Sequence, residues 1–142
     1  MNIYIKYLII TVLLMVLDVA WITLNLSTYS SAIQKVQKSP MNLRNLRSEY
    51  AFIAYIIIIF SVLYVAIPFT TQNMKKGDDD IANKLLKSFM YGGAVGFSIY
   101  GIYNFTSLAI YKDFDSSIGI IDTLWGTTLY TLTTFVFLLL PT

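Results

Sequence analysis

Residues 118–140 read IGIIDTLWGTTLYTLTTFVFLLL, an apolar run long enough to cross a bilayer as one helix. The run holds a single charged side chain, Asp122, which is followed three residues later by Trp125. A near-copy of this pattern, Asp18 followed by Trp21, lies in the first apolar run of the chain. A carboxylate at the centre of a membrane helix costs roughly 2.5–3.5 kcal/mol on insertion scales, so each Asp marks a candidate functional site.

The composition is that of a membrane protein. Of the 142 residues, 56% are hydrophobic and only 13% are charged, and the mean hydropathy is +0.65. A soluble domain carries about 25% charged residues. The small net charge of +2, with no basic stripe and no phosphate-binding loop, excludes a nucleic-acid partner. The chain has neither Cys nor His, so we expect no metal centre and no cofactor.

Four apolar runs predict four membrane-spanning helices at residues 4–26, 50–69, 85–110 and 118–140. Runs of this length and continuity are not the strands of a membrane barrel. We therefore expect one domain over residues 1–142, an all-α antiparallel bundle of four transmembrane helices. A cleaved signal peptide is the alternative for the first run, but the run is longer than the usual apolar region and contains Asp18.

An even number of spans places both termini on the same side of the membrane. The ten basic residues divide equally between the two sides, so they do not decide the orientation, and we expect both termini in the cytoplasm. Residues 27–49 are a polar, basic connection that Pro40 interrupts. Within it, residues 41–49 form either a solvated loop or a short headgroup-level helix, because Leu43, Leu46 and Tyr50 fall at helical spacing.

The polar residues of the spans share one half of the membrane. At 1.5 Å per residue, Asp18, Asn104 and Asp122 lie about 12, 9 and 6 Å in from the edge that faces the first and third connections. Their neighbours at three- and four-residue steps form stripes that should face inward, because lipid offers no hydrogen-bond partner. The predicted pocket consists of Asp18, Trp21, Asn25, Tyr100, Tyr103, Asn104, Thr106, Ser107, Asp122 and Trp125.

Close packing between helices is predicted at four glycines, because small residues let membrane helices approach one another. These are Gly92, Gly93, Gly96 and Gly126. No Lys or Arg within the spans lies at a depth that would neutralise Asp18 or Asp122. The two carboxyl groups are therefore protonated, share one proton, or hold an external cation.

Three motifs also carry a resemblance to a known family. They are Leu17-Asp18-x-x-Trp21, Tyr100-Gly101-x-Tyr103-Asn104-x-Thr106-Ser107-x-Ala109 and Asp122-x-x-Trp125-Gly126-Thr127. In this order and spacing, over nearly the whole chain, they resemble an uncharacterised, mainly bacterial integral-membrane family, domain of unknown function 2177. The resemblance implies a four-helix topology and no established activity. The family pattern has Tyr-Asp-x-Thr-Asn in the third helix, so Asn104 replaces an acid here and Ser107 replaces an amide.

Three functions follow as hypotheses. The leading one is a polytopic membrane protein whose acidic, aromatic-lined pocket handles a proton, a cation or a small polar ligand. The second is a small membrane enzyme acting on a lipid or isoprenoid, with one Asp as acid or base and a Tyr as partner. The third is a structural or assembly protein. We expect membrane lipids as partners, and ion conduction would need a homo-oligomer because four helices leave little room for a pore.

Overall fold

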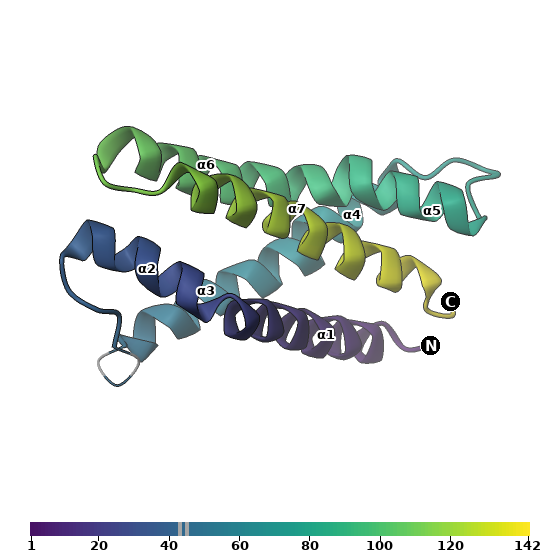
Figure 1. Ribbon diagram of the computed structural model, residues 1–142. Helices are drawn as coiled ribbons and strands as arrows, with labels where there is room; N and C mark the ends of the chain where they lie inside the picture. Colours follow the sequence, from purple (N-terminus) through teal and green to yellow (C-terminus); the bar gives the residue numbers. More distant parts are fainter. Residues whose placement is uncertain (43, 45) are drawn as a thin grey trace.

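The computed structural model describes residues 1–42, 44 and 46–142, and this part of the chain consists of helices joined by loops, with no strand (Figure 1). Two of the long helices contain a π-helical turn that joins two α-helical parts without a break. The elements in chain order are α1 (Ile3–Leu24), α2 (Leu26–Gln37), α3 (Ser48–Ser61), the π turn η2 (Val62–Ala66), α4 (Ile67–Gln72), α5 (Ile81–Lys87), the π turn η3 (Ser88–Gly93), α6 (Ala94–Ile110) and α7 (Ser116–Leu139).

The predicted all-α class is confirmed. Helix α1 and the continuous helix Ser48–Gln72 are long and apolar enough to cross a membrane. The other two expected spans lie within α5–η3–α6 and α7. Among the described residues, these two helices do not reach the apolarity of a membrane span, because they carry more Gly, Thr and other polar residues.

Residues 27–37, expected only as part of a polar connection, form most of helix α2, which was not predicted from the sequence. One face of α2 presents Tyr29, Ala32, Ile33 and Val36 at helical spacing, and this face is buried or half-buried. Basic and hydroxyl residues on the other face hid that pattern. The helix ends where Lys38 adopts a left-handed conformation two residues before Pro40. Of the predicted 41–49 helix, Leu43 lies outside the described residues.

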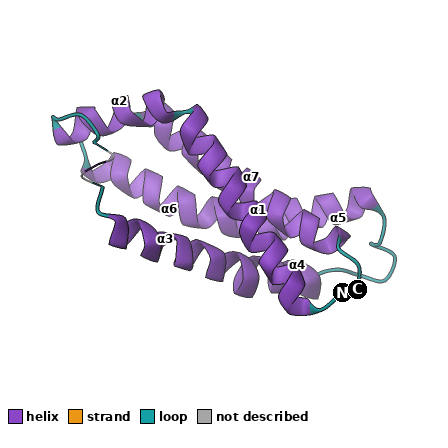
Figure 2. Ribbon diagram, turned by 90° about the horizontal axis from the view of Figure 1, so that it is seen from below, coloured by secondary structure: helices purple, strands orange, loops and turns teal. Residues whose placement is uncertain are grey.

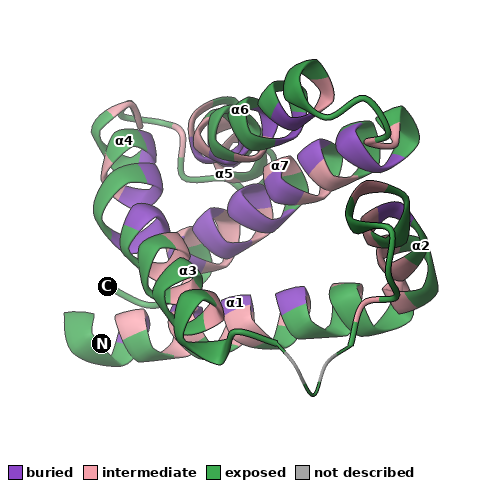
Figure 3. Cartoon of the chain, turned by 90° about the vertical axis from the view of Figure 1, so that its left-hand side faces the viewer, coloured by how far each residue is buried: buried purple, intermediate pink, exposed green. Residues whose placement is uncertain are grey.

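Helix α7 is the centre of the molecule. It contacts α1, α2, η2, α4, α5, η3 and α6, and it has the largest set of buried residues (Figure 3). Thr123, Thr127, Thr131 and Thr133 each donate a hydrogen bond to the carbonyl four residues earlier in the same helix. These four threonine hydroxyls are therefore satisfied within α7 itself while the helix stays enclosed by its neighbours.

Pro68 explains the position of η2. A proline has no N–H and its ring clashes with the carbonyl four residues back, so it disrupts a regular α-helix. Here the helix widens in the turn just before Pro68, and the Ile67 N–H reaches the Val62 carbonyl five residues back. The long helix Ser48–Gln72 thus continues past the proline.

Small residues set the distance between α7 and the η3–α6 helix. A Cβ added to Gly96 would stand 2.3 Å from the Gly126 carbonyl oxygen, and one added to Gly126 would stand 2.1 Å from the Tyr100 ring. At Gly92 and Gly93 the added carbon would meet threonine hydroxyls of α7 at 2.6 Å. The close approach of these helices therefore requires glycine at these positions.

The two chain ends lie side by side (Figure 2). The Met1 amino group donates to the Thr142 carbonyl at 2.9 Å, and the Lys6 ammonium donates to the Leu140 carbonyl at 3.3 Å. A cation near the last carbonyls of a helix is favourable because of the helix dipole. These contacts fix the end of α7 against the start of α1.

We predict that Gly96→Ala destabilises the fold by about 1–3 kcal/mol or more, because the new methyl group would collide with the α7 backbone. Gly101→Ala is the matched control in the same helix, since its Cβ would meet only Thr123 Cγ2, at an ordinary 3.6 Å. Unfolding of the detergent-solubilised protein, followed by tryptophan emission, measures both. Equal stability of the two variants would contradict the close packing.

Candidate functional site

Asp18 is buried between three helices although it carries a carboxylate; only 5% of the residue is exposed. Its Oδ1 accepts a hydrogen bond from Trp125 Nε1 of α7 at 2.9 Å. Its Oδ2 accepts one from the Tyr55 hydroxyl of α3 at 2.8 Å. Asp18 of α1 therefore joins three helices that are distant in the sequence.

Asp122 has an equivalent pair of donors. The Tyr29 hydroxyl of α2 donates to Oδ1 at 2.6 Å, and Asn104 Nδ2 of α6 donates to Oδ2 at 2.7 Å. Asn104 is itself almost fully buried, and its amide also donates to the Tyr100 carbonyl. All four oxygens of the two carboxylates thus accept one hydrogen bond each, and every donor is a neutral group.

The two tryptophans connect the carboxylates. Their rings stack with centroids 4.5 Å apart and an interplanar angle of 3°. Trp125 donates to Asp18 of the other helix, whereas Trp21 Nε1 donates at 3.0 Å to the Tyr29 hydroxyl, which in turn reaches Asp122. The Asp-x-x-Trp motifs of α1 and α7 are therefore crossed, and together with Tyr29, Tyr55 and Asn104 they form one cluster of seven residues. We call Asp18, Trp21, Tyr29, Tyr55, Asn104, Asp122 and Trp125 the acidic cluster.

No cation neutralises the acidic cluster within the described part of the chain. The ion pairs formed there involve other acidic residues, such as Asp113 and Asp115. Burial, and then the hydrogen bond to Asp122, raise the pKa of the Tyr29 hydroxyl, so that Tyr29 remains a protonated donor. The cluster thus combines two acidic side chains with donors that are all neutral groups.

Helix α2 covers the cluster and is tethered at its outer end. Lys35 and Lys38 pair with Asp115 and Asp113 of the α6–α7 connection, each at 2.7 Å. The hydrogen bond from Lys35 holds the pKa of the Asp115 carboxyl below its usual value. These pairs are largely solvent-exposed and stabilise little, so the partly buried contact of Tyr29 with Asp122 is the stronger attachment of α2.

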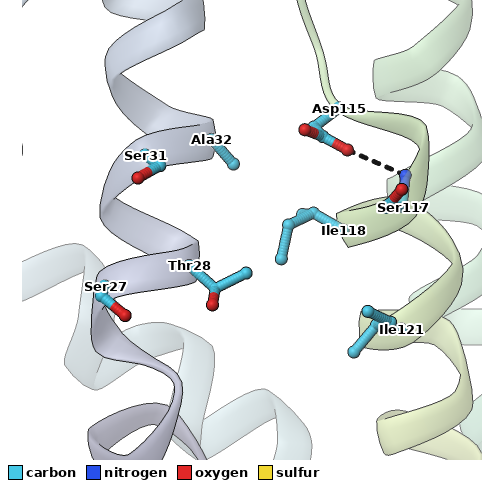
Figure 4. Close-up of a pocket in the computed structure, with 8 residues that line it drawn as sticks. All are labelled: Ser27, Thr28, Ser31, Ala32, Asp115, Ser117, Ile118 and Ile121. Atoms are coloured by element: carbon cyan, nitrogen blue, oxygen red, sulfur yellow. Dashed lines mark hydrogen bonds between the residues drawn. The ribbon is translucent and has the colours of Figure 1, made fainter.

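Two spaces flank the contact between α2 and α7, and Ala32 and Ile118 line both. The outer one, of about 320 Å³, is rich in hydroxyl groups and contains Asp115, which accepts a hydrogen bond from the Ser117 N–H at 2.9 Å (Figure 4). The inner one, of about 290 Å³, reaches Asp122 and is walled mainly by apolar side chains of α2, α6 and α7. We call this inner space the α2 cavity.

The structure brings most of the predicted pocket residues to this region but not all of them. Ser107 is buried and lines the α2 cavity, and Tyr103 lines its rim with 65% of its surface exposed. Asn25 donates to the Trp21 carbonyl and shapes the junction between α1 and α2. Thr106 is exposed and lines none of the cavities that border Asp122.

Sequence reasoning missed Tyr29 and Tyr55. Tyr29 lies in a segment interpreted only as a polar connection, and Tyr55 lies in the most apolar span without a polar neighbour one turn away. The signal that could have found Tyr29 is the helical spacing of Tyr29, Ala32, Ile33 and Val36.

Comparison with known families identifies the chain. The model of the family described as "Predicted membrane protein (DUF2177)" matches residues 3–139. The chain belongs to this family. The resemblance seen in the three motifs is thereby confirmed, and the DUF2177 description agrees with the two membrane-length helices. No curated protein and no solved structure matches the chain.

We predict that Tyr29→Phe lowers the free energy of unfolding by about 1–3 kcal/mol, because Asp122 loses a donor and the Trp21 N–H loses its acceptor. Tyr4→Phe is the control, since Tyr4 is 77% exposed. Because the only two tryptophans both lie in the cluster, their emission should also change in Tyr29→Phe. Unchanged emission and stability would show that the Tyr29 contact is not formed.

Proposed function

We propose that this DUF2177 protein is a four-span membrane protein that binds a small cationic ligand at the Asp18–Asp122 pair. The spans are α1, Ser48–Gln72, the α5–η3–α6 helix and α7. Helix α7 suits a span despite its many threonines, because most of them are buried against its neighbours or bonded to its own backbone. The exposed face of α6 is largely apolar, as a lipid-facing surface requires, with Phe97, Ile99, Ile102, Phe105 and Ile110.

The observation that carries the proposal is the environment of Asp122. Its carboxylate borders the α2 cavity, is half-buried, and among the residues that the structure describes receives hydrogen bonds only from Tyr29 and Asn104. A carboxylate has about four acceptor positions, and two of them remain for a ligand. In a low-dielectric site such a charge attracts a cation strongly.

A cation suits the cluster better than a relayed proton does. Trp125 Nε1 and Asn104 Nδ2 are obligatory donors, so each requires an oxygen that accepts. The link between the two acids runs through stacked indole rings, and an indole N–H can donate but not accept. The described residues contain no group of three acidic, His or Cys side chains that could hold a metal ion, which favours an organic or monovalent cation.

The four-span arrangement can be tested by cysteine labelling, because the chain has no Cys of its own. We expect Ser39→Cys and Lys112→Cys to react with a membrane-impermeant maleimide on intact cells. We expect Lys76→Cys to react only after the membrane is opened, as the cytoplasmic placement of the termini requires. If positions 39 and 112 differ in accessibility, the four-span arrangement is wrong. If position 76 reacts on intact cells and positions 39 and 112 do not, the four spans stand and the termini lie outside the cell.

Ligand binding can be tested with butylamine, a small organic cation at neutral pH. We expect it to change tryptophan emission saturably in the wild type and to bind about tenfold or more weakly to Asp122→Asn, as for the loss of a charge-assisted hydrogen bond. Asp79→Asn, at an exposed loop residue, is the matched control. Equal affinity of wild type and Asp122→Asn would refute a cation site at Asp122.

A further inference from the structure

A second space reaches Asp122 from the opposite side of the cluster. This crevice, of about 400 Å³, lies between α3 and α6 and is lined chiefly by aliphatic side chains, including Ala54, Ile57 and Ile99. Its size is within the range of ligand-binding pockets. The α3 and α6 backbones are not closely packed on one another, whereas α6 packs along α7. We call this space the α3–α6 crevice.

The α3–α6 crevice and the α2 cavity meet at two residues. Tyr103 and Asp122 line both spaces. The crevice walls are otherwise apolar apart from the two tyrosines, Tyr100 and Tyr103, while its inner end contains a carboxylate. An apolar crevice that is lined by a single carboxyl group is complementary to an amphiphile with an alkyl chain and a cationic head.

We propose that the ligand is a long-chain amine, whose ammonium group binds Asp122 and whose alkyl chain lies in the α3–α6 crevice. This inference rests on the cation site proposed above and adds the ligand class. The exposed side chains around the crevice, such as Ile53, Ile57 and Ile102, are those of a lipid-facing surface. An amphiphile can therefore enter sideways from the bilayer without crossing a polar region.

The charge of the acidic cluster selects the head group. Two carboxylates with neutral donors repel a phosphate, so a phospholipid head is disfavoured. The nearby cations Lys35 and Lys38 are paired with Asp115 and Asp113 at the outer end of α2. An alcohol can donate a hydrogen bond to Asp122 but lacks the charge, so it should bind more weakly than an amine.

Titration of the detergent-solubilised full chain with dodecylamine, dodecanol and butylamine tests the proposal, with tryptophan emission as the readout. Ala54→Phe places a ring in the crevice, and Ala20→Phe, on an exposed face of α1, is the matched control. The emission of each ligand-free variant shows whether the acidic cluster is intact. Asp122→Asn is titrated with the two amines in parallel.

We expect the wild type to bind dodecylamine about tenfold or more tightly than butylamine, because each buried methylene adds affinity. Dodecanol should bind about tenfold or more weakly than dodecylamine. Ala54→Phe should lower the ratio of dodecylamine affinity to butylamine affinity about tenfold, and Ala20→Phe should keep the ratio of the wild type.

The possible failures are distinguishable. If butylamine binding needs Asp122 but Ala54→Phe leaves dodecylamine affinity unchanged, the cation site stands and the crevice is not the chain site. If dodecanol binds as tightly as dodecylamine, the amine class is wrong. If neither amine distinguishes Asp122→Asn from the wild type, the proposed function fails together with this inference. Non-saturating emission changes, as in simple partitioning into detergent, would also overturn it.

Discussion

Two carboxylates inside an apolar bundle must find hydrogen-bond donors, and this requirement organises the structure. Unsatisfied buried polar groups cost more than satisfied ones return, so the fold has to bring a donor to every carboxylate oxygen. Asp18 takes its donors from α3 and α7, and Asp122 takes its donors from α2 and α6. Five helices are thereby tied to one cluster by neutral groups alone.

The same requirement supports the proposed cation site. The donors satisfy one position on each oxygen but contribute no positive charge. Asp122, unlike Asp18, is only half-buried and lies where the α2 cavity and the α3–α6 crevice meet. One carboxylate therefore serves mainly to hold helices together, while the other faces the spaces that a ligand can enter. The glycine contacts between α6 and α7 bring Asn104 and Asp122 within hydrogen-bond distance.

Much of this arrangement follows from sequence pattern. The depth of Asp18, Asn104 and Asp122 could be counted from the ends of the apolar runs, and lipid offers no partner for such groups, so their convergence was predictable. Which donor pairs with which carboxylate could not be predicted from the sequence. Trp125 donates to Asp18 on a different helix, and the local pattern does not encode this because packing sets the rotation of each helix. Tyr29 was hidden by the polarity of its segment, since an amphipathic helix that covers a bundle has the composition of a loop.

The crossed pairing of the Asp-x-x-Trp motifs is the central claim, and a double-mutant cycle between Asp18→Asn and Trp125→Phe tests it most directly. The measured quantity is the free energy of unfolding in detergent for the wild type, both single variants and the double variant. Because the two groups share a buried hydrogen bond, the account predicts that the double variant loses less than the sum of the single losses, by about 0.5–3 kcal/mol. Additive losses would contradict it and would mean that the two motifs stabilise their helices independently.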